Sequence, residues 1–216
     1  MHNTVENLIY IEELIKSKTN HEDLAKIIAV SKTFPIEKVL PLIEHGHLHY
    51  GENKVQEAID KWSDIKLKNN AIKLHLIGRL QTNKVKFALQ IFDYIHSLDS
   101  ERLAIKISEQ QIKQEKKAKI FIQVNIGNED QKSGINKDNL VDFYKFCKNL
   151  NLDIIGTMCI PPNDDNTEKY FSEMNKINKE LNFKELSMGM SGDYLEAIKN
   201  NATYIKVGSK IFGNRN

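Results

Sequence analysis

The feature that most constrains this fold is a regular alternation of short apolar runs with amphipathic helical segments along the chain. Short runs rich in β-branched and aromatic residues are typical of buried strands, and helical segments between them match the crossovers that parallel strands require. A further helical pattern, over residues 5–15, precedes the first run. The predicted strands cover residues 26–31, 48–50, 74–78, 94–98, 120–126, 154–158, 186–188 and 204–207.

This alternation predicts an α/β protein, and more specifically a single (β/α)8 TIM barrel with an additional N-terminal helix. An open, doubly wound sheet is the alternative that the pattern leaves. No linker or low-complexity tract interrupts the chain. We therefore expect one domain over residues 1–216.

Composition narrows the class of protein further. Hydrophobic residues make up 40% of the chain and charged residues 28%, as in globular rather than disordered proteins. The 31 basic and 29 acidic side chains leave a net charge of +2, which does not predict binding to nucleic acid. No apolar run approaches the ~18 residues of a membrane span, and the start of the chain lacks the apolar segment of a signal peptide. Cys147 and Cys159 form no CxxC pair, so we expect a cytoplasmic protein with two structural thiols and no membrane partner.

The first predicted strand, with the apolar residues 27–30, ends at Ser31 and Lys32. Barrels of this class place their chemistry at the carboxyl ends of the strands. Desolvation at such a position favours the neutral amine, which is the form that attacks an aldehyde. The alternative is that Lys32 only ends the strand and extends its amine to water.

Glycine and serine gather after the last two predicted strands, in residues 187–192 and at Gly208 and Ser209. Such loops present backbone N–H groups and hydroxyls ahead of helices, which suits a phosphate at the place where barrels commonly bind one. Ordinary tight turns are the alternative. Together with Lys32, this cradle predicts a ligand that carries both an aldehyde and a phosphate. Pyridoxal 5′-phosphate is such a ligand, and the sugar phosphate of a Schiff-base aldolase is another.

Lys206 lies near the end of the last predicted strand, two positions before Gly208. If its side chain points inward, a fixed cation beside a pyridine nitrogen would keep that nitrogen unprotonated and weaken the ring as an electron sink. The phase of the strand decides whether the Lys206 side chain points into the barrel, because a shift of one residue turns it outward.

His45, His47 and His49 alternate along the chain and raise the question of a metal site. His45 precedes Gly46 at an expected helix end, where a cation is favoured by the helix dipole. No carboxylate or cysteine completes an obvious ligand set, so we expect no metal.

Six segments of the chain, in order within about residues 4 to 213, carry motifs that occur together in one protein family. They are residues 29–33, 51–57, 75–84, 132–135, 186–191 and 207–213. These segments resemble the pyridoxal phosphate homeostasis protein family. The resemblance implies a single barrel similar to the N-terminal domain of alanine racemase. It also implies a lysine imine with pyridoxal phosphate, no established catalytic turnover, and a link to cellular cofactor supply and amino-acid balance.

The same resemblance implies roles for individual residues. Lys32 is the expected imine lysine, carrying N6-pyridoxal phosphate. Ser191, Gly208 and Ser209 are expected to hold the phosphate, and Asn53 to lie near the ring.

Two positions depart from the family pattern. Arg79 stands where the family usually has proline, which adds a cation near the mouth of the barrel. Lys206 stands where the family usually has an arginine facing the pyridine nitrogen. Lysine lacks the planar fork of arginine and can lose its proton when buried. We therefore expect this departure to affect the strength of cofactor binding but not its existence.

Three functions follow from these observations. The first is a cofactor-binding regulator or carrier that supplies apo-enzymes. The second is an active racemase or decarboxylase on amino acids, and the third is a Schiff-base aldolase. Racemisation needs an acid and a base on opposite faces of the bound substrate, and in alanine racemase-like enzymes a tyrosine from a second domain of a partner subunit supplies one of them. The chain ends at Asn216, soon after the last predicted strand, so we expect no such domain and no turnover. No heptad or self-pairing signal appears, and we expect a monomer.

Overall fold

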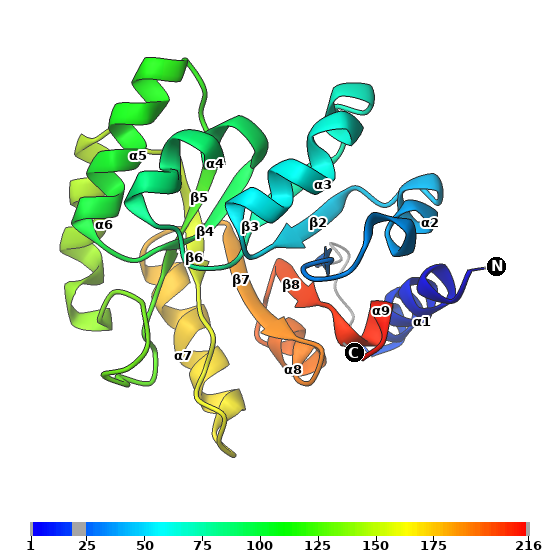
Figure 1. Cartoon of the computed structure of the whole chain (residues 1–216). Helices are drawn as coiled ribbons and strands as arrows, with labels where there is room; N and C mark the ends of the chain where they lie inside the picture. The colour runs from blue at the N-terminus through cyan, green and yellow to red at the C-terminus, as the bar shows by residue number, and fades with distance from the viewer. Residues whose placement is uncertain (1, 19–24, 215–216) are drawn as a thin grey trace.

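Eight parallel strands form a closed barrel in sequence order in the computed structural model, which describes residues 2–18 and 25–214 (Figure 1). Parallel pairing of Ala29 with Val207 joins the first strand to the last and excludes the open sheet. The (β/α)8 barrel is therefore confirmed. The strands are β1 Lys26–Val30, β2 His49–Glu52, β3 Lys73–Leu76, β4 Tyr94–Leu98, β5 Lys119–Gln123, β6 Ile154–Met158, β7 Glu185–Met190 and β8 Tyr204–Val207.

Helices surround the barrel and connect its strands (Figure 1). The additional N-terminal helix is present and packs beside the last one, where the Asn7 amide donates to the Ile211 carbonyl at 3.0 Å. The α-helices are α1 Asn3–Lys18, α2 Leu40–Glu44, α3 Val55–Lys68, α4 Val85–Ile91, α5 Glu101–Gln114, α6 Leu140–Asn149, α7 Thr167–Glu180, α8 Tyr194–Lys199 and α9 Ser209–Phe212. Short 3₁₀ segments at Ile36–Lys38, Thr82–Lys84 and Lys137–Asn139 precede α2, α4 and α6.

Strand boundaries differ from the sequence expectation in places where side chains compete for the backbone. β5 ends at Gln123 instead of continuing to residue 126. The Asn125 amide donates to the Glu129 carbonyl, and its oxygen accepts from the Glu129 N–H, so the chain turns there. β7, by contrast, extends to Met190, beyond the expected end at residue 188.

The apolar residues form two separate cores. The larger one fills the ring between the barrel wall and the helices. The smaller one lies inside the barrel and contains five buried side chains, so the barrel is a packed structure and not a pore. These five are Ile28, Tyr94, Phe121, Met158 and Tyr204.

Both thiols lie in the interior and are unpaired. Burial raises the pKa of Cys147 and of Cys159 to about 12, which suits structural thiols. Among the described residues, no helix has both the length and the hydropathy that crossing a membrane requires.

Candidate functional site

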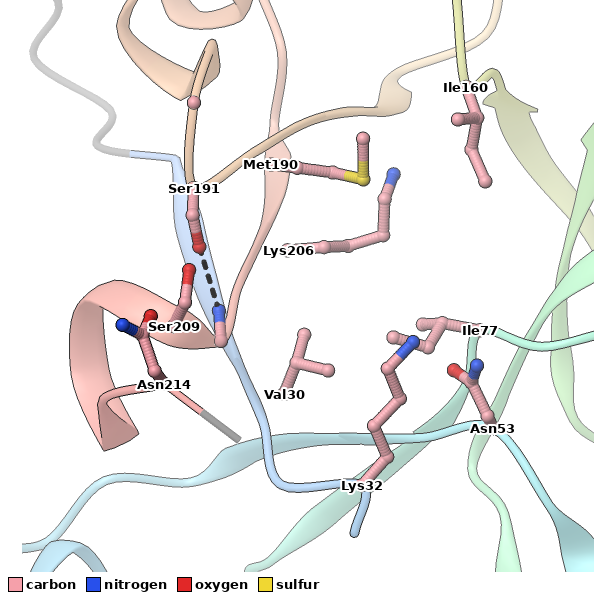
Figure 2. Close-up of a pocket in the computed structure, with 12 residues that line it drawn as sticks. Val30, Lys32, Asn53, Ile77, Ile160, Met190, Ser191, Lys206, Ser209 and Asn214 are labelled. Atoms are coloured by element: carbon pink, nitrogen blue, oxygen red, sulfur yellow. Dashed lines mark hydrogen bonds between the residues drawn. The ribbon is translucent and has the colours of Figure 1, made fainter. Parts of the chain in front are cut away.

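A pocket of about 730 Å³ opens at the carboxyl ends of the strands (Figure 2). It brings together all six residues that the sequence analysis proposed, because β1 and β8 are neighbours in the barrel wall. Residues from the two ends of the chain therefore share one site. The lining residues are Val30, Lys32, Asn53, Ile77, Ile160, Met190, Ser191, Gly192, Lys206, Gly208, Ser209 and Asn214.

Lys32 enters this pocket from the loop that follows β1. Its side chain is half-buried and points into the pocket, as Figure 2 shows. The next residue, Thr33, has a φ of 66°, a left-handed conformation that is uncommon outside glycine and asparagine. The structure thus directs the Lys32 amine toward the site.

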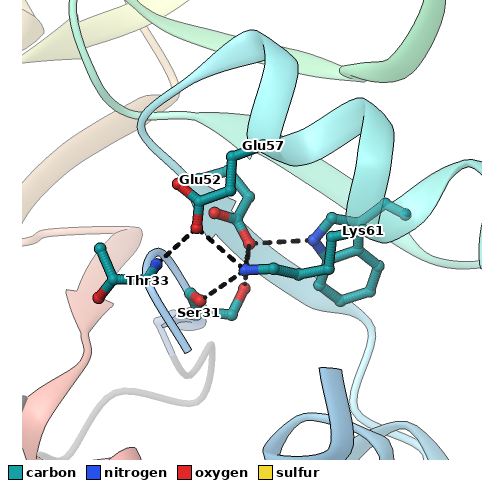
Figure 3. A network of polar contacts seen from close by, with 6 residues as sticks. Ser31, Thr33, Glu52, Glu57 and Lys61 are labelled. Atoms are coloured by element: carbon teal, nitrogen blue, oxygen red, sulfur yellow. Dashed lines mark hydrogen bonds and ion pairs between the residues drawn. The ribbon is translucent and has the colours of Figure 1, made fainter. Parts of the chain in front are cut away.

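The loop that carries Lys32 is anchored by hydrogen bonds to a buried carboxylate (Figure 3). Oε1 of Glu52, a fully buried residue of β2, accepts hydrogen bonds from the Ser31 hydroxyl at 2.8 Å and the Trp62 indole at 3.0 Å. The Lys61 ammonium lies 2.9 Å from the same oxygen and forms an ion pair with it. A buried carboxylate needs such partners, since burial of an unpaired charge is costly.

The same Lys61 ammonium extends the network to both sides of Lys32 (Figure 3). It donates to the Ser31 carbonyl at 2.9 Å and to Glu57 at 3.2 Å, and Glu57 accepts the Thr33 N–H at 2.5 Å. Burial acts to raise the pKa of Glu57, but the bonds from the Thr33 N–H and from Lys61 outweigh it and lower that pKa. The two neighbours of Lys32 are therefore both fixed to α3.

Lys206, the third residue of β8, lines the pocket from inside the barrel. Its side chain points inward and is only 5% exposed, and its amine donates to the Ser187 hydroxyl at 3.3 Å. The outward alternative is wrong. Burial lowers the pKa of Lys206 to about 8, while Cys159 and Asp193 act in the opposite direction. This lysine can thus exist in either protonation state near neutral pH.

Hydroxyl and amide donors line the side of the pocket between β7 and α9. The Gly208 N–H donates to the Ser191 hydroxyl at 3.2 Å, which fixes that oxygen and leaves its own proton to be donated elsewhere (Figure 2). Ser209 begins α9, and the first N–H groups of a helix have no acceptor within it. This arrangement suits an anionic group with several oxygens.

Asn53 lies on the opposite side of the pocket from this donor group, close to Lys32 (Figure 2). A Cβ at Gly78 would come within 2.4 Å of the Asn53 carbonyl oxygen, so glycine is needed for the close approach of the two loops. Arg79 is exposed and lines a separate depression with Asp99, so its cation does not reach the pocket. Met190 and Ile160, each about two-fifths exposed, form an apolar edge around the opening.

Sequence reasoning missed the Glu52, Lys61 and Trp62 network. The signal available was a carboxylate in a buried strand, at Glu52, which implies a buried partner. His45 lies directly after the last residue of α2, as the sequence analysis expected, and β2 begins at His49. In the described ranges, no three His, Cys, Asp or Glu residues are placed to hold a metal ion.

The chain is similar to proteins of known family and structure. Residues 11–216 match the family of the alanine racemase N-terminal domain. The pyridoxal phosphate homeostasis proteins of Pasteurella multocida (strain Pm70) and Aquifex aeolicus (strain VF5) are 35% and 37% identical to this chain. The alignments cover 95% and 90% of this chain, and 93% and 89% of those proteins.

Among solved structures, PipY of Synechococcus elongatus PCC7942 with PLP bound superimposes with a TM-score of 0.86 at 30% sequence identity. The match covers 97% of this chain and 100% of that one. Alanine racemase of Clostridium difficile 630 gives a TM-score of 0.75 at 15% identity, and the match covers 57% of that longer chain. The second likeness concerns the fold alone.

Proposed function

The chain belongs to the pyridoxal phosphate homeostasis protein family, and we propose that it binds pyridoxal 5′-phosphate in the mouth pocket and maintains its supply in the cell. One observation carries this proposal. Lys32, Lys206 and the Ser191–Gly208–Ser209 donor group converge on a single pocket. The cofactor-bound relative PipY, which shares the fold over nearly the whole length, supports the same ligand.

The chemistry of the lining fits the cofactor. When bound, pyridoxal phosphate supplies an aldehyde, a pyridine ring and a phosphate ester. The pocket offers an amine on a fixed loop at Lys32, hydroxyl and N–H donors at Ser191 and Ser209, and an apolar edge at Met190. Each part of the ligand thus has a suitable group in the lining.

We assign the residues as follows. Lys32 is the point of covalent attachment, since its neighbours Ser31 and Thr33 are anchored while its own amine faces the pocket. Ser191, Gly208 and Ser209 hold the phosphate, and Asn53 lies beside the ring.

Lys206 supplies a cation toward the pyridine nitrogen. A cation there disfavours protonation of the ring nitrogen and weakens the ring as an electron sink. The protein therefore holds the cofactor and releases it to apo-enzymes, without amino-acid turnover. It acts as a single domain, as a monomer and in the cytoplasm.

Absorbance of the purified protein, before and after reduction with borohydride, tests attachment. We expect a visible band in the presence of pyridoxal phosphate, lost on reduction, and a modified Lys32 in the peptide mass spectrum. Lys32→Ala abolishes the fixed adduct, whereas the exposed neighbour Lys54→Ala retains it. A fixed adduct at full yield in Lys32→Ala would overturn the assignment.

The racemase alternative is tested by turnover. We expect the loaded protein, incubated with L- and D-amino acids in deuterated water, to show no exchange at Cα at a useful rate. Exchange near the typical enzyme turnover of about 10 s⁻¹ would replace the carrier proposal with the racemase.

A further inference from the structure

A row of imidazoles runs through the interior of the barrel, from its amino-terminal end to Lys206. Nδ1 of His49 lies 2.9 Å from Nε2 of His75, and Nδ1 of His75 lies 2.8 Å from Nε2 of His96. Nδ1 of His96 then lies 2.8 Å from the Ser187 hydroxyl, to which the Lys206 amine donates. Each distance is that of a hydrogen bond.

The two ends of this row face different cavities. Lys206 lines the mouth pocket. His49 is half-buried and lines a smaller cavity of about 280 Å³ near the start of β1, with Lys26 and His47. The row therefore connects solvent-accessible space at opposite ends of the barrel.

The rings in the row are neutral. Burial lowers the pKa of His75 and of His96 well below the usual value, and it lowers that of His49 to about 4. A neutral imidazole has one N–H donor and one bare nitrogen acceptor. Because His75 and His96 use both nitrogens within the row, all of its bonds must run in the same direction.

The protonation state of Lys206 selects that direction. An ammonium can only donate, so the Ser187 oxygen accepts from Lys206. Among the described residues, the remaining hydrogen-bond partner for the Ser187 hydroxyl proton is Nδ1 of His96, so the hydroxyl donates to it. Every ring then carries its proton on Nε2. With a neutral Lys206 amine the opposite direction becomes possible, in which every ring carries its proton on Nδ1 and the Ser187 hydroxyl donates to the amine.

We propose that Ser187, His96, His75 and His49 form a proton path that lets Lys206 exchange its proton with solvent at the opposite end of the barrel. Lys206 gives a proton to the Ser187 oxygen while the Ser187 hydroxyl proton moves to Nδ1 of His96. The Nε2 proton of each ring then moves to Nδ1 of the next, and the Nε2 proton of His49 passes to water. One proton leaves, and every ring remains neutral.

The surroundings support neutral rings at rest. Burial is the main effect that opposes a charge on His49. His47, Lys26 and Lys73 oppose it further, and Asp93, which favours it, is outweighed. Around Lys206, Cys159 and Asp193 favour the charged form against the effect of burial. The path is independent of the mouth, so Lys206 can change its charge while a ligand fills the pocket. This inference does not require the proposed cofactor.

The test is long-range ¹H–¹⁵N correlation spectroscopy of histidine in the ligand-free protein, which reports the tautomer of each ring. We expect His49, His75 and His96 to carry the proton on Nε2 at about pH 6.5 and on Nδ1 at about pH 9.5, with one shared midpoint near that of Lys206. Rings that keep their tautomers while Lys206 titrates would overturn the proposal. This measurement needs no variant.

Ser187→Ala removes the hydroxyl that joins Lys206 to the rings, and we expect the tautomers to stop following Lys206. Ser97→Ala is the matched control, because Ser97 follows His96 on β4, is buried like Ser187, and its hydroxyl has no hydrogen-bond partner in the described part of the chain. Ser187→Thr keeps a hydroxyl and should retain the coupled change. Coupling that persists in Ser187→Ala would contradict the path through this residue.

Discussion

The mouth and the interior of the barrel differ in how they use polar side chains. At the mouth, Lys32 and Ser191 come from loops and Ser209 from the start of α9, and all three line an open pocket. In the interior, His75 and His96 lie in mid-strand and bond to one another, stacked on Tyr94 and Phe121 with ring centroids 4.2 and 4.3 Å apart. The comparison teaches that segments beyond the strand ends present polar groups to an open pocket, whereas residues within strands present them to each other. Lys206 belongs to both regions, since it lines the pocket and bonds to the interior row through Ser187.

The largest loss of stability should come from Lys61→Met, which removes the cation of the network that anchors the Lys32 loop. This leaves the buried Glu52 carboxylate without its cation, and removal of one partner of a buried ion pair costs about 3–5 kcal/mol. Urea unfolding followed by Trp62 fluorescence measures the loss. Lys145→Met, which removes an exposed ion pair with Asp142, should cost less than about 1 kcal/mol. Similar losses in the two variants would mean that the buried pair has no special role.

Acid should weaken the interior at a higher pH than the support of the mouth, where the pKa of Glu57 lies below its usual 4.5 because the bonds from the Thr33 N–H and Lys61 outweigh burial. The pKa of each of His47, His49, His75 and His96 is lower in the folded protein than the usual 6.5, mainly because of burial. The unfolded chain therefore binds more protons below pH 6.5, and stability that is complete above this value falls as the pH drops toward about 4.

A single variant can measure this contribution. Each such histidine adds a slope of about 1.4 kcal/mol per pH unit within its window, so His96→Leu should reduce the pH dependence of the unfolding free energy by that amount. His45→Gln, at an exposed position, should leave the slope unchanged. An unaltered slope in His96→Leu would refute the assignment of a neutral, buried His96.

Substitution of Ser209 should affect ligand binding and leave the stability of the interior unchanged. Ser209→Ala removes one hydroxyl donor, which corresponds to a loss of about 0.5–1.5 kcal/mol in cofactor affinity. Ser209→Asp adds repulsion between two anions and should weaken binding further. Equilibrium titration with pyridoxal phosphate distinguishes the two variants. Equal affinities of the two variants would show that Ser209 does not contact the phosphate.

The smallest change is expected from Lys206→Arg, which tests the residue that the two regions share. Arginine keeps its charge at all relevant pH values and offers more donors, so affinity for pyridoxal phosphate should be retained or increased. Lys206→Met should bind more weakly. If titration gives the same affinity for both variants, the charge of Lys206 does not act on the ligand.

Much of the mouth could be predicted from the sequence, because one rule places strand ends together. Lys32, Gly208 and Ser209 follow β1 and β8, and closure of the barrel brings them side by side. The side to which Lys206 points could not be predicted, since a shift of one residue reverses it. The structure resolves this phase through the bond to Ser187.

The interior was harder to predict for a different physical reason. His75 and His96 stand singly in apolar runs, and each satisfies its nitrogens through partners on other strands. A sequence shows that such a residue is polar and buried but does not identify its partner. The Glu52–Lys61 pair presents the same difficulty, because its geometry depends on how α3 packs on β2.

Closure of the barrel by β1 and β8 also bears on how the protein is made. A ribosome delivers Lys32 just after the first strand of the barrel, and Lys206 and Ser209 only with the last strand and the helix after it. Synthesis adds roughly 5–20 residues per second, so strands β1 to β7 can begin to collapse before β8 and α9 have been made. At that stage Lys206, Gly208 and Ser209 are still missing from the pocket. A nascent or prematurely terminated chain that lacks β8 and α9 therefore lacks part of the pocket lining, and the proposed binding of pyridoxal phosphate should require both elements.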